Sequence, residues 1–241
     1  MVIGIIDDDK NEINSIQRTI ITIIKRYNLD ANELKFKIYD LNSDVGKLTD
    51  NLIKVIIDDI LKFEISILII DHKIVVNSNE IFNGSDIFEQ IRKDAPDFPT
   101  IIMTNVVEDS MKNNYVDPDK VYAKSEFFKI GEYAKEKTEN MLKNVKRYNE
   151  LRSTTQEELD ELKSELAKNT ENQDIVNKIV EKEKELDKYL PMQRSYLEEV
   201  INIEELKEIL KLIGYTLADT TSKTIYEILA ERGIEGKIKG R

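Results

Sequence analysis

The first half of the chain is constrained most by a regular alternation of short β-branched segments with segments of helical periodicity. The apolar segments that predict strands are VIGII (2–6), LKFKIY (34–39), ISILII (65–70), TIIMT (100–104) and KVYA (120–123). The segments that predict helices are 10–27, 46–62, 84–94 and about 107–115, with a further helix beginning near Ser125. Strands that alternate with helices pair in parallel through right-handed crossovers. The sequence therefore predicts an α/β domain with a doubly wound five-stranded parallel sheet.

After residue 130 the pattern becomes purely helical. Leu159, Leu162 and Leu166 follow a heptad-like spacing, and so do the apolar residues of 175–190. The phase breaks across KNTENQD (168–174), which is rich in turn-forming residues. An antiparallel helical hairpin explains this break best, and a single long parallel coiled coil is the alternative. A third alternative is that this highly charged segment is a solvated helix without a partner.

Pro191 marks the end of this helical stalk. The segment 191–241 predicts two further helices, the first with Asn202 as its N-cap and Gly214 as its end. So small a helical module is marginal alone, and we expect it to pack on something else. The predicted domains are a 1–130 α/β domain, a 131–190 stalk and a 191–241 module.

Composition excludes several kinds of site. The chain has no cysteine and one histidine, His72, so thiolate and multi-histidine metal sites are impossible and any metal must be a hard cation held by oxygen. The net charge is −11, which makes nucleic acid a poor default partner. No segment has the uninterrupted apolar length of a membrane span, and the N-terminus lacks a signal-peptide pattern. We therefore expect a cytoplasmic protein.

Acidic residues stand where two of the predicted strands end. Asp7 and Asp8 follow the strand 2–6, and Asp71 follows the strand 65–70. The carboxyl ends of parallel strands share one edge, and in the flavodoxin-like strand order these two strands are neighbours. Three carboxylates brought together repel one another unless a cation lies between them. The sequence thus predicts a site for Mg²⁺ or Mn²⁺.

Two further polar residues fall at the same edge: Thr104 ends the fourth strand and Lys124 follows the fifth. An aspartate can attack a phosphoryl group when a metal ion and a lysine offset the negative charges. We expect the central Asp71 to be the phosphoacceptor, and Thr104 and Lys124 to contact the phosphoryl group. The expected metal ligands are Asp7, Asp8, Asp71 and the backbone carbonyl of Lys73.

Four segments carry a resemblance to a known family: IGIIDDD, ILIID, GSDIFEQIRKDAPDFPTIIMTN and VYAKSEFF. In this order they resemble the signature segments of the receiver domain of bacterial two-component response regulators, over about residues 1–130. The resemblance implies an aspartate that takes phosphate from a histidine kinase or phosphotransfer protein in a phosphorelay. It also implies a switch that passes to the face of the fourth helix, fifth strand and fifth helix. By correspondence these roles fall on Asp7, Asp8, Asp71, Thr104 and Lys124.

The sequence departs from the family pattern in the segments around this site. Ser125 and Val75 replace usual prolines, the loop from Asp71 to Gly84 is long, and the second helix is extended. The usual aromatic switch position is Val121, and strand alternation turns the neighbouring Tyr122 to the opposite face. The phosphate chemistry is expected to be intact, whereas the aromatic readout is in question.

The leading hypothesis is a response regulator whose only chemistry is its own phosphorylation and dephosphorylation. Its stalk would relay the switch to a protein-binding module, with a homodimer through the coiled coil as one arrangement. One alternative is a pseudo-receiver scaffold that works without phosphorylation. Another is a DNA-binding transcriptional regulator with a C-terminal helix-turn-helix. Asp9 is expected to cap a helix, and His72 is expected to be structural.

Overall fold

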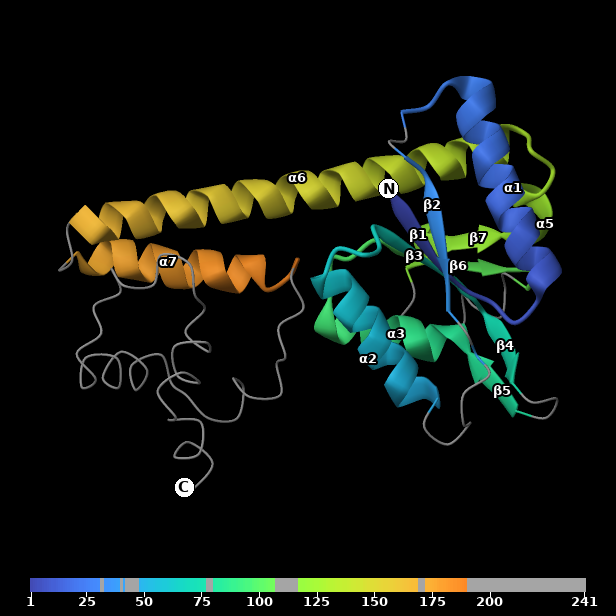
Figure 1. The fold of residues 1–241 in the computed structure, drawn as a ribbon, viewed down its shortest axis with the longest axis horizontal. Coiled ribbons are helices and arrows are strands. Elements are labelled where there is room, and N and C mark those ends of the chain that lie inside the picture. The colour runs from blue at the N-terminus through green and yellow to red at the C-terminus, as the bar shows by residue number, and fades with distance from the viewer. Residues whose placement is uncertain are drawn as a thin grey trace. The chain divides into compact units, whose positions relative to one another are not determined.

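The computed structural model describes residues 1–30, 33–39, 41, 48–76, 80–106, 117–168 and 172–189. The chain divides into two compact units, each considered by itself (Figure 1). Unit 1 contains residues Met1–Glu150 together with Lys188–Pro191, and unit 2 begins at Leu151. The predicted helix at about 107–115 and the predicted module at 191–241 lie outside the described residues.

Unit 1 is built on a five-stranded parallel sheet. Its strands are β1 (Val2–Ile6), β2 (Lys35–Ile38), β3 (Ile67–Asp71), β6 (Thr100–Thr104) and β7 (Val121–Ala123). The strand order is β2-β1-β3-β6-β7, and every pairing is parallel. This is the flavodoxin-like order of doubly wound sheets. The predicted α/β fold class is confirmed.

The helices of unit 1 begin and end close to the predicted residues. The described helices of the unit are α1 (Lys10–Tyr27), α2 (Leu48–Leu61), α3 (Gly84–Asp94), α5 (Lys124–Phe127) and the first part of α6 (Glu132–Lys168), with a 3₁₀ turn at Pro118–Lys120. Asp9 caps α1 as expected, because its side chain accepts a hydrogen bond from the Asn11 N–H. None of the described helices is long and apolar enough to cross a membrane.

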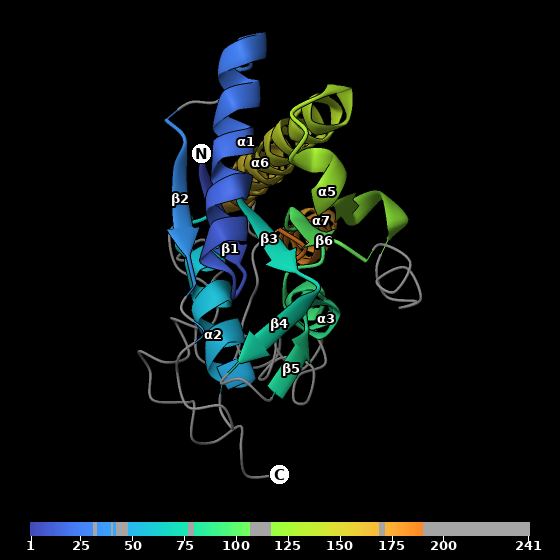
Figure 2. The same cartoon turned by 90° about the vertical axis from the view of Figure 1, so that its right-hand side faces the viewer.

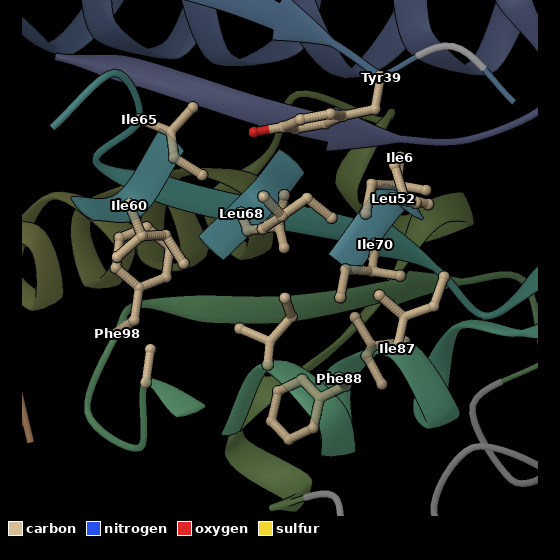
Figure 3. Packing of buried hydrophobic residues seen from close by; sticks show 14 of the residues in the cluster. Ile6, Tyr39, Leu52, Ile60, Ile65, Leu68, Ile70, Ile87, Phe88 and Phe98 are labelled. Carbon is tan, nitrogen blue, oxygen red and sulfur yellow. The ribbon is translucent and has the colours of Figure 1, made fainter. Parts of the chain in front are cut away.

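The sheet is buried on both faces, and residue alternation along β3 divides the core in two. Leu68 and Ile70 pack in a cluster with α2 and α3 residues such as Ile60 and Phe88 (Figure 3). The other face holds Ile67 and Ile69, which share a cluster with apolar residues of α1, α5 and α6. Each isoleucine removed from water contributes about 1.5–3 kcal/mol, so this double layer fixes the strand register firmly.

A β-hairpin fills the segment that was expected to be a long loop between Asp71 and Gly84. Strands β4 (Lys73–Val76) and β5 (Glu80–Asn83) pair antiparallel as a separate two-stranded sheet directly after β3 (Figure 2). The segments KIVV and EIFN are rich in β-branched and aromatic residues, which favour strands. Each is only four residues long, however, and periodicity is a weak signal at that length.

Unit 1 extends past the predicted boundary at residue 130. Ala134, Met141 and Val145 of α6 belong to the same apolar cluster as α1. Further along α6, the ring of Tyr148 meets the rings of Phe98 and Tyr189 edge-on. The Tyr148 hydroxyl donates a hydrogen bond to the Tyr189 carbonyl oxygen. These contacts explain why Lys188–Pro191 group with the α/β unit.

Unit 2 contains an antiparallel helical hairpin. The second part of α6 and the helix α7 (Gln173–Leu186) are joined by the short segment 169–172, and Asn172 caps α7. Their shared apolar cluster is formed by Leu159, Leu166, Ile175 and Ile179. Cross-helix ion pairs join Lys163 to Glu183 at 3.1 Å and Lys182 to Glu158 at 2.6 Å. Within the described residues, the heptad seams therefore face each other inside one chain.

Candidate functional site

Three carboxylates meet at the carboxyl edge of the central strands. Asp7 and Asp8 follow β1, and Asp71 is the last residue of β3. Ile6 is in register with Ile70, so both strands present their acids at the same level. Each of the three residues offers a carboxylate oxygen, and these oxygens all lie within 4.8 Å of one another. The predicted convergence of Asp7, Asp8 and Asp71 is present.

Lys124 is the cation of the site. It follows β7, its side chain is 1% exposed, and its Nζ lies 2.8 Å from Asp7 Oδ2 and 2.6 Å from Asp71 Oδ1. The Asp7 side chain is also 1% exposed, whereas that of Asp71 is 12% exposed. Charges buried this deeply are stable only when they are paired. Lys124 thus supplies a compensating charge for two of the carboxylates.

Burial and pairing act in opposite directions on these groups. Desolvation raises the pKa of Asp7 to about 6, although its hydrogen bond with Lys124 lowers it. Desolvation likewise raises the pKa of Asp71, against the attraction of Lys124. For Lys124, burial lowers the pKa, but the nearby Asp71, Asp7 and Glu12 outweigh burial and the pKa is raised. Lys124 therefore stays charged at neutral pH.

Backbone groups hold the acids in place. The Asp9 N–H donates to Asp7 Oδ1 at 2.9 Å, and the Lys73 N–H donates to Asp71 Oδ2 at 3.2 Å. Gly84 packs directly on the end of β3, since a Cβ at this position would lie 1.9 Å from the Asp71 carbonyl oxygen. Its N–H also donates to the carbonyl oxygen of His72 at 2.8 Å. Only glycine fits here without moving the Asp71 backbone.

The donor set suits a hard divalent cation. Asp7, Asp8 and Asp71 offer carboxylate oxygens, which Mg²⁺ and Mn²⁺ prefer, and no softer ligand is among them. Asp8 is exposed, which leaves room for the water ligands that Mg²⁺ retains. These three residues would hold the ion. Ligation by the Lys73 carbonyl stays a prediction.

Thr104 lies at the same edge of the sheet. It is the last residue of β6, it is buried, and β6 lies between β3 and β7. Its hydroxyl oxygen accepts a hydrogen bond from the Val106 N–H at 3.0 Å. The hydroxyl proton is thus left for another partner. The phosphoryl contact assigned to Thr104 stays a prediction.

The structure adds two residues that strand-end counting did not identify. The Glu12 carboxylate, in the first turn of α1, forms an ion pair with the Lys124 ammonium group. The Asn105 side-chain amide donates to Glu12 Oε1 at 3.0 Å. Glu12 lies in the first turn of α1, only four residues after Asp8, so this short spacing keeps it near the acids that follow β1. That spacing was the available signal.

Val121, Tyr122 and His72 are all buried. Tyr122 is buried in the cluster that includes Ile67 and Ile69, while Val121 belongs to the cluster of the opposite face. The alternation expected for this pair is therefore present. His72 is buried, and its Nδ1 lies 3.2 Å from Ser85 Oγ, which agrees with a structural histidine.

Comparison with known proteins finds little similarity. No family model and no curated protein matches the chain. A solved structure of the RcsB response regulator of Salmonella typhimurium, described in terms of conformational dynamism for DNA interaction, aligns at 14% identity. The alignment covers 87% of this chain and 97% of that one, with a TM-score of 0.37. So loose a likeness does not assign this chain to a family.

Proposed function

We propose that this protein is a response-regulator-like phosphoacceptor that carries a phosphoryl group on Asp71 and needs a divalent cation, Mg²⁺ or Mn²⁺, to do so. The observation that carries the proposal is the cluster of Asp7, Asp8 and Asp71, two of which pair with the buried Lys124. The flavodoxin-like strand order supports it, because ligand sites of such sheets lie at the carboxyl ends of the strands.

The proposed chemistry is one phosphoryl transfer. A carboxylate oxygen of Asp71 forms a bond to phosphorus while the bond from phosphorus to the donor's leaving group breaks. The leaving group departs with that electron pair and takes a proton from solvent. The side chain of Asp71 is the accessible member of the buried pair, at 12% exposed. Of the two carboxylates paired with Lys124, it is the one that a donor can reach.

The other residues offset the negative charge that the transfer brings. Lys124 stabilises the transferred oxygens through its N–H groups, and Thr104 offers its hydroxyl proton. Asp7 and Asp8 would hold the divalent cation, which would offset the negative charge of the phosphoryl group. The Lys73 and Asp9 N–H groups keep the acids oriented throughout.

The donor in this proposal is a histidine kinase or a phosphotransfer protein, and the output is a protein contact. A homodimer built on the heptad seam is left out of the proposal. Leu159 and Leu166 of α6 are buried against Ile175 and Ile179 of α7 within the same chain. The seam is thus already covered.

The test is phosphorylation by acetyl phosphate with Mg²⁺, followed by intact-mass spectrometry. We expect one phosphoryl group on the wild type, none on Asp71→Asn, and none when EDTA removes the cation. Asp58→Asn is the matched control, because Asp58 is an exposed acid of α2 paired with Lys62. Phosphorylation that persists in Asp71→Asn would refute the acceptor. If the wild type is never modified, the proposal fails and the alternative, a scaffold that works without phosphorylation, is favoured.

A further inference from the structure

We propose that Glu12 competes with the phosphoryl group for Lys124 and so keeps the site in its resting state. This inference rests on the proposed function, because it concerns the regulation of the same site. The contact that carries it is the ion pair between the Glu12 carboxylate and the Lys124 ammonium group, with Asn105 holding the second oxygen of Glu12.

All three N–H donors of Lys124 already have an acceptor. An ammonium group has three N–H bonds. Its Nζ meets one oxygen each from Asp7, Asp71 and Glu12. A phosphoryl oxygen can therefore gain a full hydrogen bond from Lys124 only by displacing one of these three acceptors.

Glu12 is the acceptor that can leave most easily. Its side chain is 27% exposed, against 1% for Asp7 and 12% for Asp71. Asp7 also receives the Asp9 N–H and is one of the metal-binding acids, and Asp71 is the residue being modified. Glu12 has a longer side chain on the first turn of a helix, so it reaches solvent by changing rotamer without moving the backbone.

Asn105 restrains Glu12 in the paired position. Its side-chain amide donates to Glu12 Oε1 at 3.0 Å, while Glu12 Oε2 faces Lys124. Asn105 directly follows Thr104 and is itself exposed. The two partners of Glu12 thus come from the ends of β6 and β7, one on each carboxylate oxygen.

Charge makes the competition stronger. Three acids, Asp7, Asp71 and Glu12, pair with one lysine, and Asp8 lies beside two of them. A phosphoryl group on Asp71 carries up to two negative charges where the carboxylate carried one. As long as Glu12 remains beside Lys124, its carboxylate repels the incoming oxygens at short range. Moving it into solvent removes both the repulsion and the competition for the donor.

The experiment measures beryllofluoride affinity and the rate of acetyl phosphate modification, both at saturating Mg²⁺. Glu12→Gln removes the charge, and we expect tighter binding of beryllofluoride and faster modification, each by about tenfold. Asn105→Ala leaves every charge in place and only releases Glu12, so we expect a smaller gain in the same direction. Glu132→Gln is the matched control, because Glu132 is an acid with an 85% exposed side chain at the start of α6, and it should match the wild type.

The outcomes separate this inference from the proposed function. If the wild type is not modified on Asp71 at all, both fall together. Suppose that the wild type is modified and that a folded Glu12→Gln is modified at the same rate or more slowly. Then only the Glu12 inference is overturned. Circular dichroism establishes folding of each variant. Should Glu12→Gln fail to fold, Asn105→Ala decides, since a rate equal to the wild type would overturn the inference.

Discussion

The α/β unit and the helical hairpin are stabilised in different ways. In the α/β unit, strands from distant parts of the sequence share two apolar layers, and the ion pair between Lys124 and Asp7 joins residues 117 positions apart. The hairpin depends on a narrow seam between helices that follow one another, with Leu166 and Ile175 among its buried residues. The difference teaches that the acidic site depends on long-range packing, whereas the hairpin can form from local contacts.

The largest effect is expected from Lys124→Met. The change leaves Asp7 and Asp71 buried without their shared cation, and removing one partner of a buried ion pair costs about 3–5 kcal/mol. Urea denaturation should show this loss. Added Mg²⁺ should recover part of it, because an ion among the acids replaces the lost charge. Lys129→Met, in an exposed pair with Glu126, is the control and should change little.

A matched pair of cavities tests whether the two units are independent. Ile69→Ala empties the sheet core, and Leu166→Ala empties the seam of the hairpin. Each should cost about 2–5 kcal/mol within its own unit. Hydrogen exchange should show faster exchange in β3 for the first variant and in α7 for the second. If Leu166→Ala also speeds hydrogen exchange in β3, the two units are not independent.

Gly84→Ala tests the close approach of Gly84 to Asp71, the proposed acceptor. The new Cβ must push the Asp71 carbonyl oxygen away from 1.9 Å, which should cost about 1–3 kcal/mol as overpacking. It should also slow phosphorylation, because the acceptor moves relative to Lys124. Gly131→Ala is the control, since a Cβ there meets nothing within 4 Å. Equal phosphorylation rates for the two variants would show that the proposed reaction at Asp71 tolerates this movement.

The smallest effect is expected in the hairpin ion pair. Lys163→Ala removes the 3.1 Å contact with Glu183, in which both side chains are partly exposed. Such pairs are worth less than about 1 kcal/mol and weaken in salt. Thermal melting at low and high salt measures the change. Comparison of this loss of stability with that of Lys124→Met separates the contribution of a buried lysine from that of a partly exposed one.

Much of the fold could be predicted from the sequence because periodicity reports burial. Helix α1 occupies the residues that its pattern predicts, and β1 and β6 do so as well. The three acids could be predicted to meet, because parallel strands end at one edge and Asp7 and Asp71 end neighbouring strands.

The unpredicted features have physical reasons. The hairpin of β4 and β5 is too short for alternation to be decisive. Glu12 reaches the site from a helix, where its place depends on the tertiary approach of α1 to Lys124 as well as on spacing. The close approach of Gly84 to Asp71 arises only when α3 is docked. Sequence patterns identify faces and ends of elements, but they do not give such distances.

The hydrogen bond from the Tyr148 hydroxyl to the Tyr189 carbonyl has a consequence for the length of the chain. Both tyrosines belong to unit 1, so residues 149–188 form an excursion whose two ends are fixed at one aromatic junction. Matched changes in the lengths of α6 and α7 leave the contact between the two tyrosines in place. The arm is therefore a natural place for insertions and deletions, since whole helical turns can be added or lost while the junction stays shut.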